Sequence, residues 1–142
     1  MKVQVINKSD NDLPNYETIA SAGCDVRSTH GAHIGPGLSC LIKTGLYVEI
    51  PIGYEIQIRP RSGLALKKQV TVLNTPGTID ADYRGEIGVI IINHGLGPVS
   101  LGKGERIAQL VLNKVEQIKW ESVLELSDTS RGTGGFGSTG KK

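Results

Sequence analysis

The sequence predicts an all-β protein: an antiparallel, jelly-roll-like β-barrel or sandwich with at most one short helix and a flexible C-terminal arm. Apolar and polar residues alternate along residues 46–59, short strand-like runs recur between segments rich in Gly, Pro, Asn and Asp, and the chain ends in the glycine-rich RGTGGFGSTGKK. Alternation with a period of two is typical of a strand with one buried face. Repeated short strands separated by turns favour a sandwich or a jelly roll.

The clearest strand pattern is LYVEIPIGYEIQIRP, residues 46–60, in which the apolar side chains occupy the even positions as far as residue 58. Pro51 and Gly53 interrupt this run. Because proline cannot donate to a ladder of backbone hydrogen bonds, we expect a turn here and a hairpin of two strands. Further strands are expected at 2–6, 70–73, 87–92 and 108–118.

Only one segment, SGLALKK at 62–68, carries helix formers in series, and Ser62 is expected to cap its first turn. A length of 142 residues is typical of a single domain. The composition changes only after Asp128. We therefore expect a β domain at 1–128 and a glycine-rich arm at 129–142.

The composition limits the possible partners. A net charge of +2 is too small to favour direct binding of nucleic acid or of an anionic membrane. The chain start MKVQVINKSDND lacks the apolar region of a secretory signal, and no apolar run is long enough to cross a bilayer. We expect an intracellular, cytoplasmic protein. With 38% apolar but only 4% aromatic residues, the core is expected to be aliphatic.

The two cysteines, Cys24 and Cys40, are expected to be buried thiols. Together with His30 and His33 they could be considered as zinc ligands, but the spacing is irregular and includes no close cysteine pair, so buried thiols are favoured.

Two internal segments carry candidate chemistry. TPGTIDADYRGE places Asp80, Asp82 and Tyr83 in or beside an expected β-hairpin, although aspartates in such turns also serve only to bond their own backbone. RPRSGLALK offers two arginines and a serine ahead of the expected helix, which suits phosphate oxygens, but a solvated basic turn has the same composition.

The C-terminal RGTGGFGSTG is similar in composition to a phosphate-binding P-loop but lacks the Gly-Lys-Ser/Thr ending. A flexible linker is the alternative. Arg131 and Phe136 favour a loop that closes over a nucleotide, because a guanidinium binds phosphate and a phenyl ring stacks on a base.

In order, five segments together resemble the motifs of the trimeric dUTPase family: AGCDV (22–26), PRSGLALK (60–67), NTPGTIDADYRGE (74–86), GERIAQLV (104–111) and RGTGGFGSTG (131–140). The resemblance spans nearly the whole chain. It implies hydrolysis of dUTP to dUMP and pyrophosphate by attack of water on the α-phosphorus, which limits uracil incorporation into DNA and supplies dUMP for thymidylate synthesis. It also implies Mg²⁺ as cofactor and a homotrimer whose active sites are shared between chains.

The resemblance implies a role for each motif. Asp80 would activate and aim the attacking water. Asn74 and the backbone of Gly77, Thr78 and Ile79 would read the uracil edge, and Tyr83 would lie against the deoxyribose.

The remaining motifs would bind the phosphates and the metal. Asp25 would steady the outer water shell of Mg²⁺, and Arg106 would be structural. In the arm, Arg131 would face the γ-phosphate and Phe136 would stack on uracil, ordered by substrate. The phosphates would be contacted by Arg61, Ser62, Gly63, Gln109, Gly135, Gly137 and Ser138.

The sequence departs mildly from the commoner family pattern at Cys24, Val26 and Glu105. Two rival functions remain. A dCTP deaminase would share the fold, but Asp80 and the full arm disfavour it. A noncatalytic binder or structural trimer would not need every expected catalytic position, and all of them are present.

Overall fold

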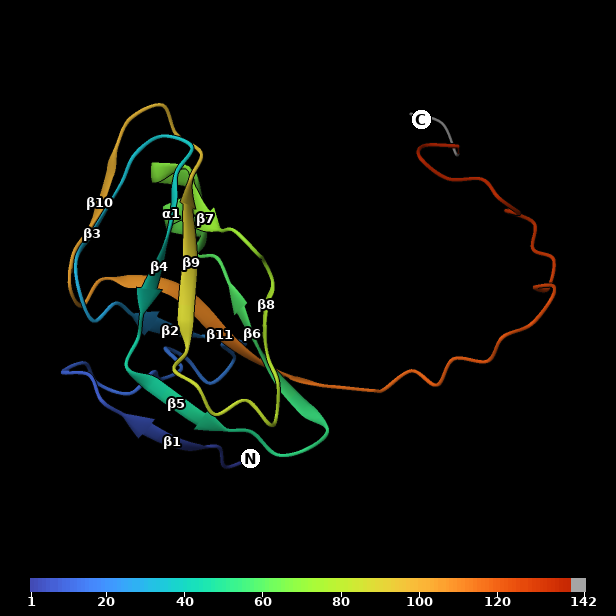
Figure 1. The fold of residues 1–142 in the computed structure, drawn as a ribbon, viewed down its shortest axis with the longest axis horizontal. Helices are drawn as coiled ribbons and strands as arrows, with labels where there is room; N and C mark the ends of the chain where they lie inside the picture. Colours follow the sequence, from blue (N-terminus) through green and yellow to red (C-terminus); the bar gives the residue numbers. More distant parts are fainter. Residues whose placement is uncertain (139–142) are drawn as a thin grey trace.

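The computed structural model describes residues 1–138, in which eleven strands and one short helix surround one apolar core (Figure 1). The elements are β1 (Gln4–Asn7), β2 (Cys24–Arg27), β3 (Ala32–Ile34), β4 (Ser39–Lys43), β5 (Leu46–Glu49), β6 (Tyr54–Arg59), α1 (Ser62–Lys68), β7 (Val70–Val72), β8 (Gly77–Ile79), β9 (Gly88–Asn93), β10 (Val99–Leu101) and β11 (Arg106–Lys114). The all-β prediction with at most one short helix is confirmed.

The strands form four small sheets, and within each sheet neighbouring strands are antiparallel. The largest has the order β2-β11-β6-β8, the next has the order β4-β9-β7, and β1-β5 and β10-β3 are two-stranded. Sequence neighbours seldom pair, so the sheets are joined by crossovers that bring distant segments together. The strand β8 lies at the edge of its sheet, with β6 as its partner.

The core is aliphatic, as predicted, since the apolar side chains buried in the described part of the chain are those of Val, Ile, Leu and Ala. Each sheet contributes: Ile42, Val89 and Ile91 come from the three-stranded sheet, Val26, Ile58 and Leu110 from the four-stranded sheet, and Val48 and Leu101 from the two smaller ones. A core shared by all sheets explains why strands of only three residues are stable here.

The predicted hairpin at 46–60 is wrong. The turn exists, because the Tyr54 N–H donates to the Pro51 carbonyl at 3.2 Å and Gly53 has a φ of 87°. The two strands that it separates, however, do not pair with each other. The strand β5 pairs with β1, whereas β6 pairs with β11 and β8. The turn therefore carries the chain from one sheet to another.

The helix α1 has the predicted bounds, but the predicted cap is wrong. Arg61 occupies the N-cap position without a side-chain cap hydrogen bond, and Ser62 is already the first helical residue. The helix ends at Gln69, whose φ of 54° lies in the left-handed region and whose N–H donates to the Ala65 carbonyl. Leu64 is the buried side chain that fixes this short helix to the core.

The other predicted strands are confirmed with shifted ends. Residues 2–6 correspond to β1, 70–73 to β7, 87–92 to β9 and 108–118 to β11. The structure adds β2, β3, β4, β8 and β10, which the alternation pattern did not reveal. The strand β11 ends at Lys114, before the predicted end at 118.

The cysteines are free thiols, but each is half-buried rather than fully buried. Burial raises the pKa of both thiols. Among residues 1–138, no group of three or more His, Cys, Asp or Glu side chains is placed to hold a metal ion. In the same residues no helix has the length and apolar character needed to span a membrane.

After Lys114 the chain runs away from the body of the protein as an extended tail, drawn in orange and red in Figure 1. Residues 118–126, here called the tail segment, mix apolar and polar side chains and form no strand. Their apolar members are exposed: Ile118, Trp120, Val123, Leu124 and Leu126.

Candidate active site

The third motif lies in the long connection between β7 and β9, two strands that are antiparallel neighbours in one sheet. It is not a simple hairpin, because β8 within it joins β6 of the other sheet. This connection forms most of a pocket of about 200 Å³, here called the β8 pocket. The pocket is lined by Ile58, Asn74, Gly77, Thr78, Ile79, Asp80, Tyr83, Glu86 and Gly88.

The shape of the β8 pocket depends on local features of the sequence. Gly77 lies opposite Ile58 in the register of β8 with β6. A Cβ added at Gly77 would lie 3.2 Å from the Asn74 side-chain nitrogen and 3.3 Å from Ile58 Cβ, so glycine allows this close packing. Beyond β8 the chain turns sharply, with the Tyr83 N–H donating to the Asp80 carbonyl at 3.2 Å.

Six of the residues predicted to bind or hydrolyse the substrate thus line one pocket. Asn74, Thr78, Asp80 and Tyr83 are exposed, so their polar groups are accessible. Gly77 and Ile79 are buried, with Ile79 packed in the core. The pocket therefore combines a carboxylate, an amide and a phenol with a sheet edge, where backbone donors and acceptors are free of strand partners.

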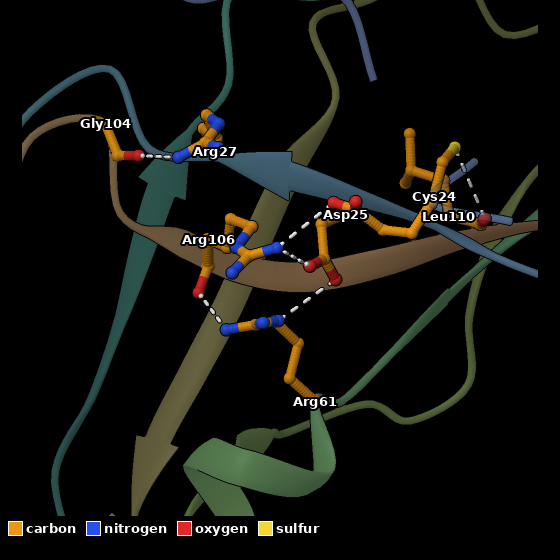
Figure 2. A network of polar contacts seen from close by, with 8 residues as sticks. Cys24, Asp25, Arg27, Arg61, Gly104, Arg106 and Leu110 are labelled. Atoms are coloured by element: carbon orange, nitrogen blue, oxygen red, sulfur yellow. Dashed lines mark hydrogen bonds and ion pairs between the residues drawn. The ribbon is translucent and has the colours of Figure 1, made fainter. Parts of the chain in front are cut away.

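A second group of predicted residues surrounds Asp25 (Figure 2). The Arg61 Nε donates to Asp25 Oδ1 at 3.0 Å, and Arg106 Nη1 lies 3.2 Å from Asp25 Oδ2. Arg61 Nη1 also donates to the Arg106 carbonyl at 3.2 Å. The side chain of Asp25 is only 12% exposed, so one carboxylate fixes two guanidinium groups. Asp25, Arg61 and Arg106 are called the Asp25 cluster below.

The surrounding elements hold the Asp25 cluster in place. Asp25 on β2 lies opposite Gln109 on β11, and Gln109 in turn lies opposite Arg59 on β6. Arg106 also pairs with Glu17 at 3.2 Å, in agreement with its expected structural role. Ser62 and Gly63 directly follow Arg61 and are exposed at the start of α1.

Glu105 ties the helix to the turn before β11. Its carboxylate accepts hydrogen bonds from the Gly102 N–H at 2.8 Å and from Lys68 Nζ at 3.1 Å. Burial acts to raise the pKa of Glu105. These hydrogen bonds and the charges of Lys68 and Arg61 outweigh it and hold the pKa below the ordinary glutamate value. Glu105 therefore carries a negative charge that stabilises this corner of the fold.

The carboxylates suit an indirect role toward Mg²⁺ better than a direct one. Mg²⁺ in nucleotide sites is bound by phosphate oxygens and retains several waters. Both oxygens of Asp25 already face guanidinium groups. Each carboxylate oxygen has two lone pairs, however, so Asp25 retains capacity to accept a hydrogen bond from a metal-bound water. This donor set fits an outer-shell contact.

The β8 pocket and the Asp25 cluster are separate within one chain. Asp25, Arg61, Ser62, Gly63 and Gln109 do not line the pocket. Among its described lining residues, the charged side chains are Asp80 and Glu86, both negative. The pocket alone therefore offers no cation for a polyanionic ligand, whereas the cluster supplies guanidinium groups.

The structure does not bring the described part of the arm, residues 129–138, to either group. Arg131 Nε donates to the Gly134 carbonyl at 2.7 Å, and the Ser138 N–H donates to the Gly135 carbonyl at 3.0 Å, so these turns are local. Phe136 is fully exposed, and Gly137 has a φ of 89°. The last two residues of the expected fifth motif, at 139 and 140, lie outside the described residues.

Sequence reasoning assigned no role to three pocket residues. Ile58 belongs to the alternating run and was expected only in the core. Gly88 begins β9, and Glu86 ends the third motif. The position of Glu86 directly after the turn of the third motif is the feature of the sequence that could have indicated its place in the pocket. The pairing of Asp25 with Arg61 had no local signal, because 36 residues separate them.

Comparisons with known proteins agree with this distribution of residues. The sequence model of the dUTPase family matches residues 9–140. The deoxyuridine 5'-triphosphate nucleotidohydrolase of Bdellovibrio bacteriovorus is 53% identical over 143 aligned positions, covering 99% of this chain and 96% of that protein.

Solved structures show the same fold. A mutant dUTPase of Staphylococcus bacteriophage 80alpha, solved with dUpNHpp, has a TM-score of 0.90 and 30% identity, with 98% of each chain covered. A mutant dUTPase of phage phi11 of S. aureus, described with a structural Mg(II) ion, has a TM-score of 0.82 over 90% of this chain and 100% of that one, and its 24% identity supports the fold alone. With the jelly-roll-like fold shared and nearly the whole sequence matched, the chain belongs to the dUTPase family.

Proposed function

We infer that this chain is a hydrolase that converts dUTP to dUMP and pyrophosphate by attack of water on the α-phosphorus. The chain belongs to the dUTPase family. The structural observation that supports the inference is that Asn74, Thr78, Asp80 and Tyr83 line the same β8 pocket. The name of the 53% identical relative describes the same reaction class. This activity limits uracil incorporation into DNA, supplies dUMP for thymidylate synthesis, and acts on the cytoplasmic nucleotide pool.

The β8 pocket binds the nucleoside. Uracil presents an acceptor, a donor and a second acceptor along one edge. The outer edge of β8 offers backbone N–H and C=O groups at Gly77, Thr78 and Ile79, and the amide of Asn74 adds a donor and an acceptor. Tyr83 lies against the deoxyribose, where a ribose 2′-OH clashes with its ring.

Asp80 positions the nucleophile. Its carboxylate is exposed at the rim of the β8 pocket, directly after the strand that reads the base. A carboxylate at this place holds a water in line with the leaving pyrophosphate and accepts its proton as the oxygen–phosphorus bond forms.

The triphosphate is bound by groups outside the pocket. Arg61 contributes its guanidinium, Ser62 its hydroxyl, Gly63 its backbone N–H and Gln109 its amide. Asp25 keeps Arg61 oriented, and its remaining lone pairs would accept a hydrogen bond from a water of the hydrated Mg²⁺. The metal would supply positive charge to the phosphates and the leaving group.

The enzyme works as a homotrimer with active sites shared between chains. Among the described residues that line the β8 pocket none is cationic, so a triphosphate bound there needs cations from another source. The Asp25 cluster of a neighbouring chain supplies them. The exposed apolar side chains of the tail segment support assembly, because a segment with Trp120 and four aliphatic side chains in solvent gains stability when another chain covers it.

The glycine-rich arm, residues 129–142 after the β domain at 1–128, closes over the bound nucleotide. Phe136 stacks on the uracil and Arg131 contacts the γ-phosphate. Gly135, Gly137 and Ser138 surround the phosphates with backbone and hydroxyl donors. Substrate binding provides the free energy that orders this arm.

A substrate panel tests the reaction. Pyrophosphate release is measured with dUTP, dTTP, dCTP and UTP at equal concentrations in the presence of Mg²⁺. We expect rapid release from dUTP alone. Comparable turnover of all four nucleotides would contradict the assignment of the pocket to deoxyuridine, and ammonia release from dCTP would indicate a deaminase instead.

A further inference from the structure

The ring of Tyr83 is held in one place by its own segment of chain. Its hydroxyl donates a hydrogen bond to the backbone carbonyl of Glu86 at 3.0 Å, three residues further along. The backbone N–H of Tyr83 donates a hydrogen bond to the Asp80 carbonyl at 3.2 Å. The side chain is 42% exposed and lines the β8 pocket, so these bonds fix a wall of the pocket rather than a part of the core.

Gly85 lies against the hydroxyl end of this ring. A Cβ added at Gly85 would lie 2.5 Å from Cζ and 2.9 Å from Cε2 of Tyr83, with the Tyr83 hydroxyl also in contact. Carbon atoms that are not bonded do not approach so closely, so any side chain here forces the ring to move. Glycine at position 85 is therefore required by the position of Tyr83, and not by a positive φ.

The carbonyl that accepts the hydrogen bond from the Tyr83 hydroxyl belongs to Glu86, and the side chain of Glu86 is itself anchored. The Glu86 carboxylate accepts a hydrogen bond from the Gly45 N–H at 2.9 Å and lies 3.6 Å from Lys43 Nζ. Only 21% of the Glu86 side chain is exposed. The carboxylate thus connects the pocket segment to the turn between β4 and β5.

The next residue strengthens the same connection. The Ile87 N–H donates to the Leu46 carbonyl at 2.8 Å, and the hydroxyl of Thr44 donates to the Ile87 carbonyl at 2.6 Å. Thr44 is 1% exposed and also accepts from the Leu46 N–H. The peptide that holds the Tyr83 hydroxyl is consequently braced by buried hydrogen bonds, which are costly to leave unmade.

We propose that Gly85 and Glu86 are positioning residues that set the selectivity for 2′-deoxyribose by fixing Tyr83 as a rigid wall of the β8 pocket. This inference rests on the proposed function. A wall that is free to shift accommodates an added 2′-oxygen, whereas a ring that is hydrogen-bonded at one end and packed against Gly85 cannot retreat. Neither residue touches the reacting phosphorus in this account; each acts through Tyr83.

The test compares dUTP with UTP in Gly85→Ala. The measured quantity is the ratio of kcat/KM for dUTP to kcat/KM for UTP. Rejection of a single added hydroxyl by pocket shape changes kcat/KM by up to about 100-fold. We therefore expect the ratio in the variant to be lower than in the wild type by a factor of about 10 or more. The matched control is Gly97→Ala, because a Cβ added at Gly97 meets no atom within 4 Å and this glycine lies outside the pocket.

Two variants at Glu86 provide a second, milder test. Glu86→Ala removes the bond to the Gly45 N–H, and the ratio should fall in the same direction. Glu86→Gln retains an oxygen that accepts this bond, so the ratio should stay close to that of the wild type. Recovery in the glutamine variant distinguishes a positioning role from a general loss of stability, since both changes remove the pair with Lys43.

The outcomes separate the two levels of inference. A folded Gly85→Ala variant with the wild-type ratio would overturn the positioning role and leave the proposed function intact. If Gly85→Ala does not fold, Glu86→Ala decides, and an unchanged ratio in that variant overturns the proposal. A wild-type protein that fails to release pyrophosphate from dUTP would overturn the proposed function, and this inference with it.

Discussion

Asp25 holds Arg61 through a hydrogen bond of 3.0 Å from the guanidinium Nε, although the two residues lie in different motifs and on different elements. The second carboxylate oxygen of Asp25, Oδ2, lies 3.2 Å from Arg106 Nη1. Asp25 is therefore a structural centre of the fold as well as the expected outer-shell partner of the metal, so a substitution here should affect both stability and activity.

Asp25→Asn should lower both stability and activity. The amide cannot neutralise two guanidinium groups, and the loss of charge-assisted hydrogen bonds is expected to cost about 1–3 kcal/mol in the free energy of unfolding. Because Arg61 loses its orientation, kcat/KM for dUTP should fall as well. Urea unfolding and steady-state kinetics measure the two effects. The control is Asp10→Asn, which removes an exposed pair with Lys103 and should change neither.

Asp80→Asn should abolish most of the turnover while binding is retained. General-base loss costs about two to four powers of ten in kcat, and an exposed side chain contributes little to stability. Binding of dUpNHpp, measured by calorimetry, should remain within a few-fold of the wild type. Asp82→Asn is the matched control, since Asp82 lies in the same turn but does not line the β8 pocket. Near-normal turnover in Asp80→Asn would place the base elsewhere.

The lowered pKa of Glu105 predicts that the stability of the fold depends on pH. Its folded-state pKa is lowered, so its contribution is fully present above the unfolded value of about 4.3 and is lost as the pH falls through the folded value. Glu105→Gln should therefore lower the melting temperature near neutral pH, and the difference from the wild type should shrink below about pH 4. Thermal melts across pH 3–7 measure this. A difference that grows on acidification would contradict the assignment.

Trp120→Asp should prevent assembly without unfolding the domain. Trp120 is 88% exposed in the single chain, so its replacement removes nothing from the core. A charge in a covered apolar interface is unfavourable, and sedimentation should show single chains. Lys119→Asp is the control, because it places a negative charge beside Trp120 without removing an apolar side chain. A trimer that survives Trp120→Asp would mean that the tail segment is not part of the interface.

The local parts of the fold could be predicted from the sequence, and the pairings could not. Residues 62–68 form the predicted helix because Leu64 and its helix-forming neighbours act over one or two turns. Alternation correctly identified β5 and β6 but gave no information about partners, which lie far away in the chain: β1 for β5, and β11 for β6. Strands as short as β3 and β10 contain too few residues to show a period.

The same distinction holds for the candidate site. The residues of the third motif converge on one pocket because they are adjacent in sequence and enclosed by a single connection. The contact of Asp25 with Arg61 depends on the antiparallel registers of β2 with β11 and of β11 with β6, which alternation cannot specify. The Ser62 cap failed for a local reason, since the helix begins one residue earlier than a capping serine requires.

Trp120 is the only tryptophan of the chain, and it belongs to the exposed tail segment rather than to the core. An indole in water emits at longer wavelength than one enclosed by protein, so this chain carries an intrinsic fluorophore located where neighbouring subunits are expected to meet. Its emission maximum should shift to the blue as the concentration rises through the association range. Subunit exchange can thus be followed in unlabelled protein, independently of any catalytic readout.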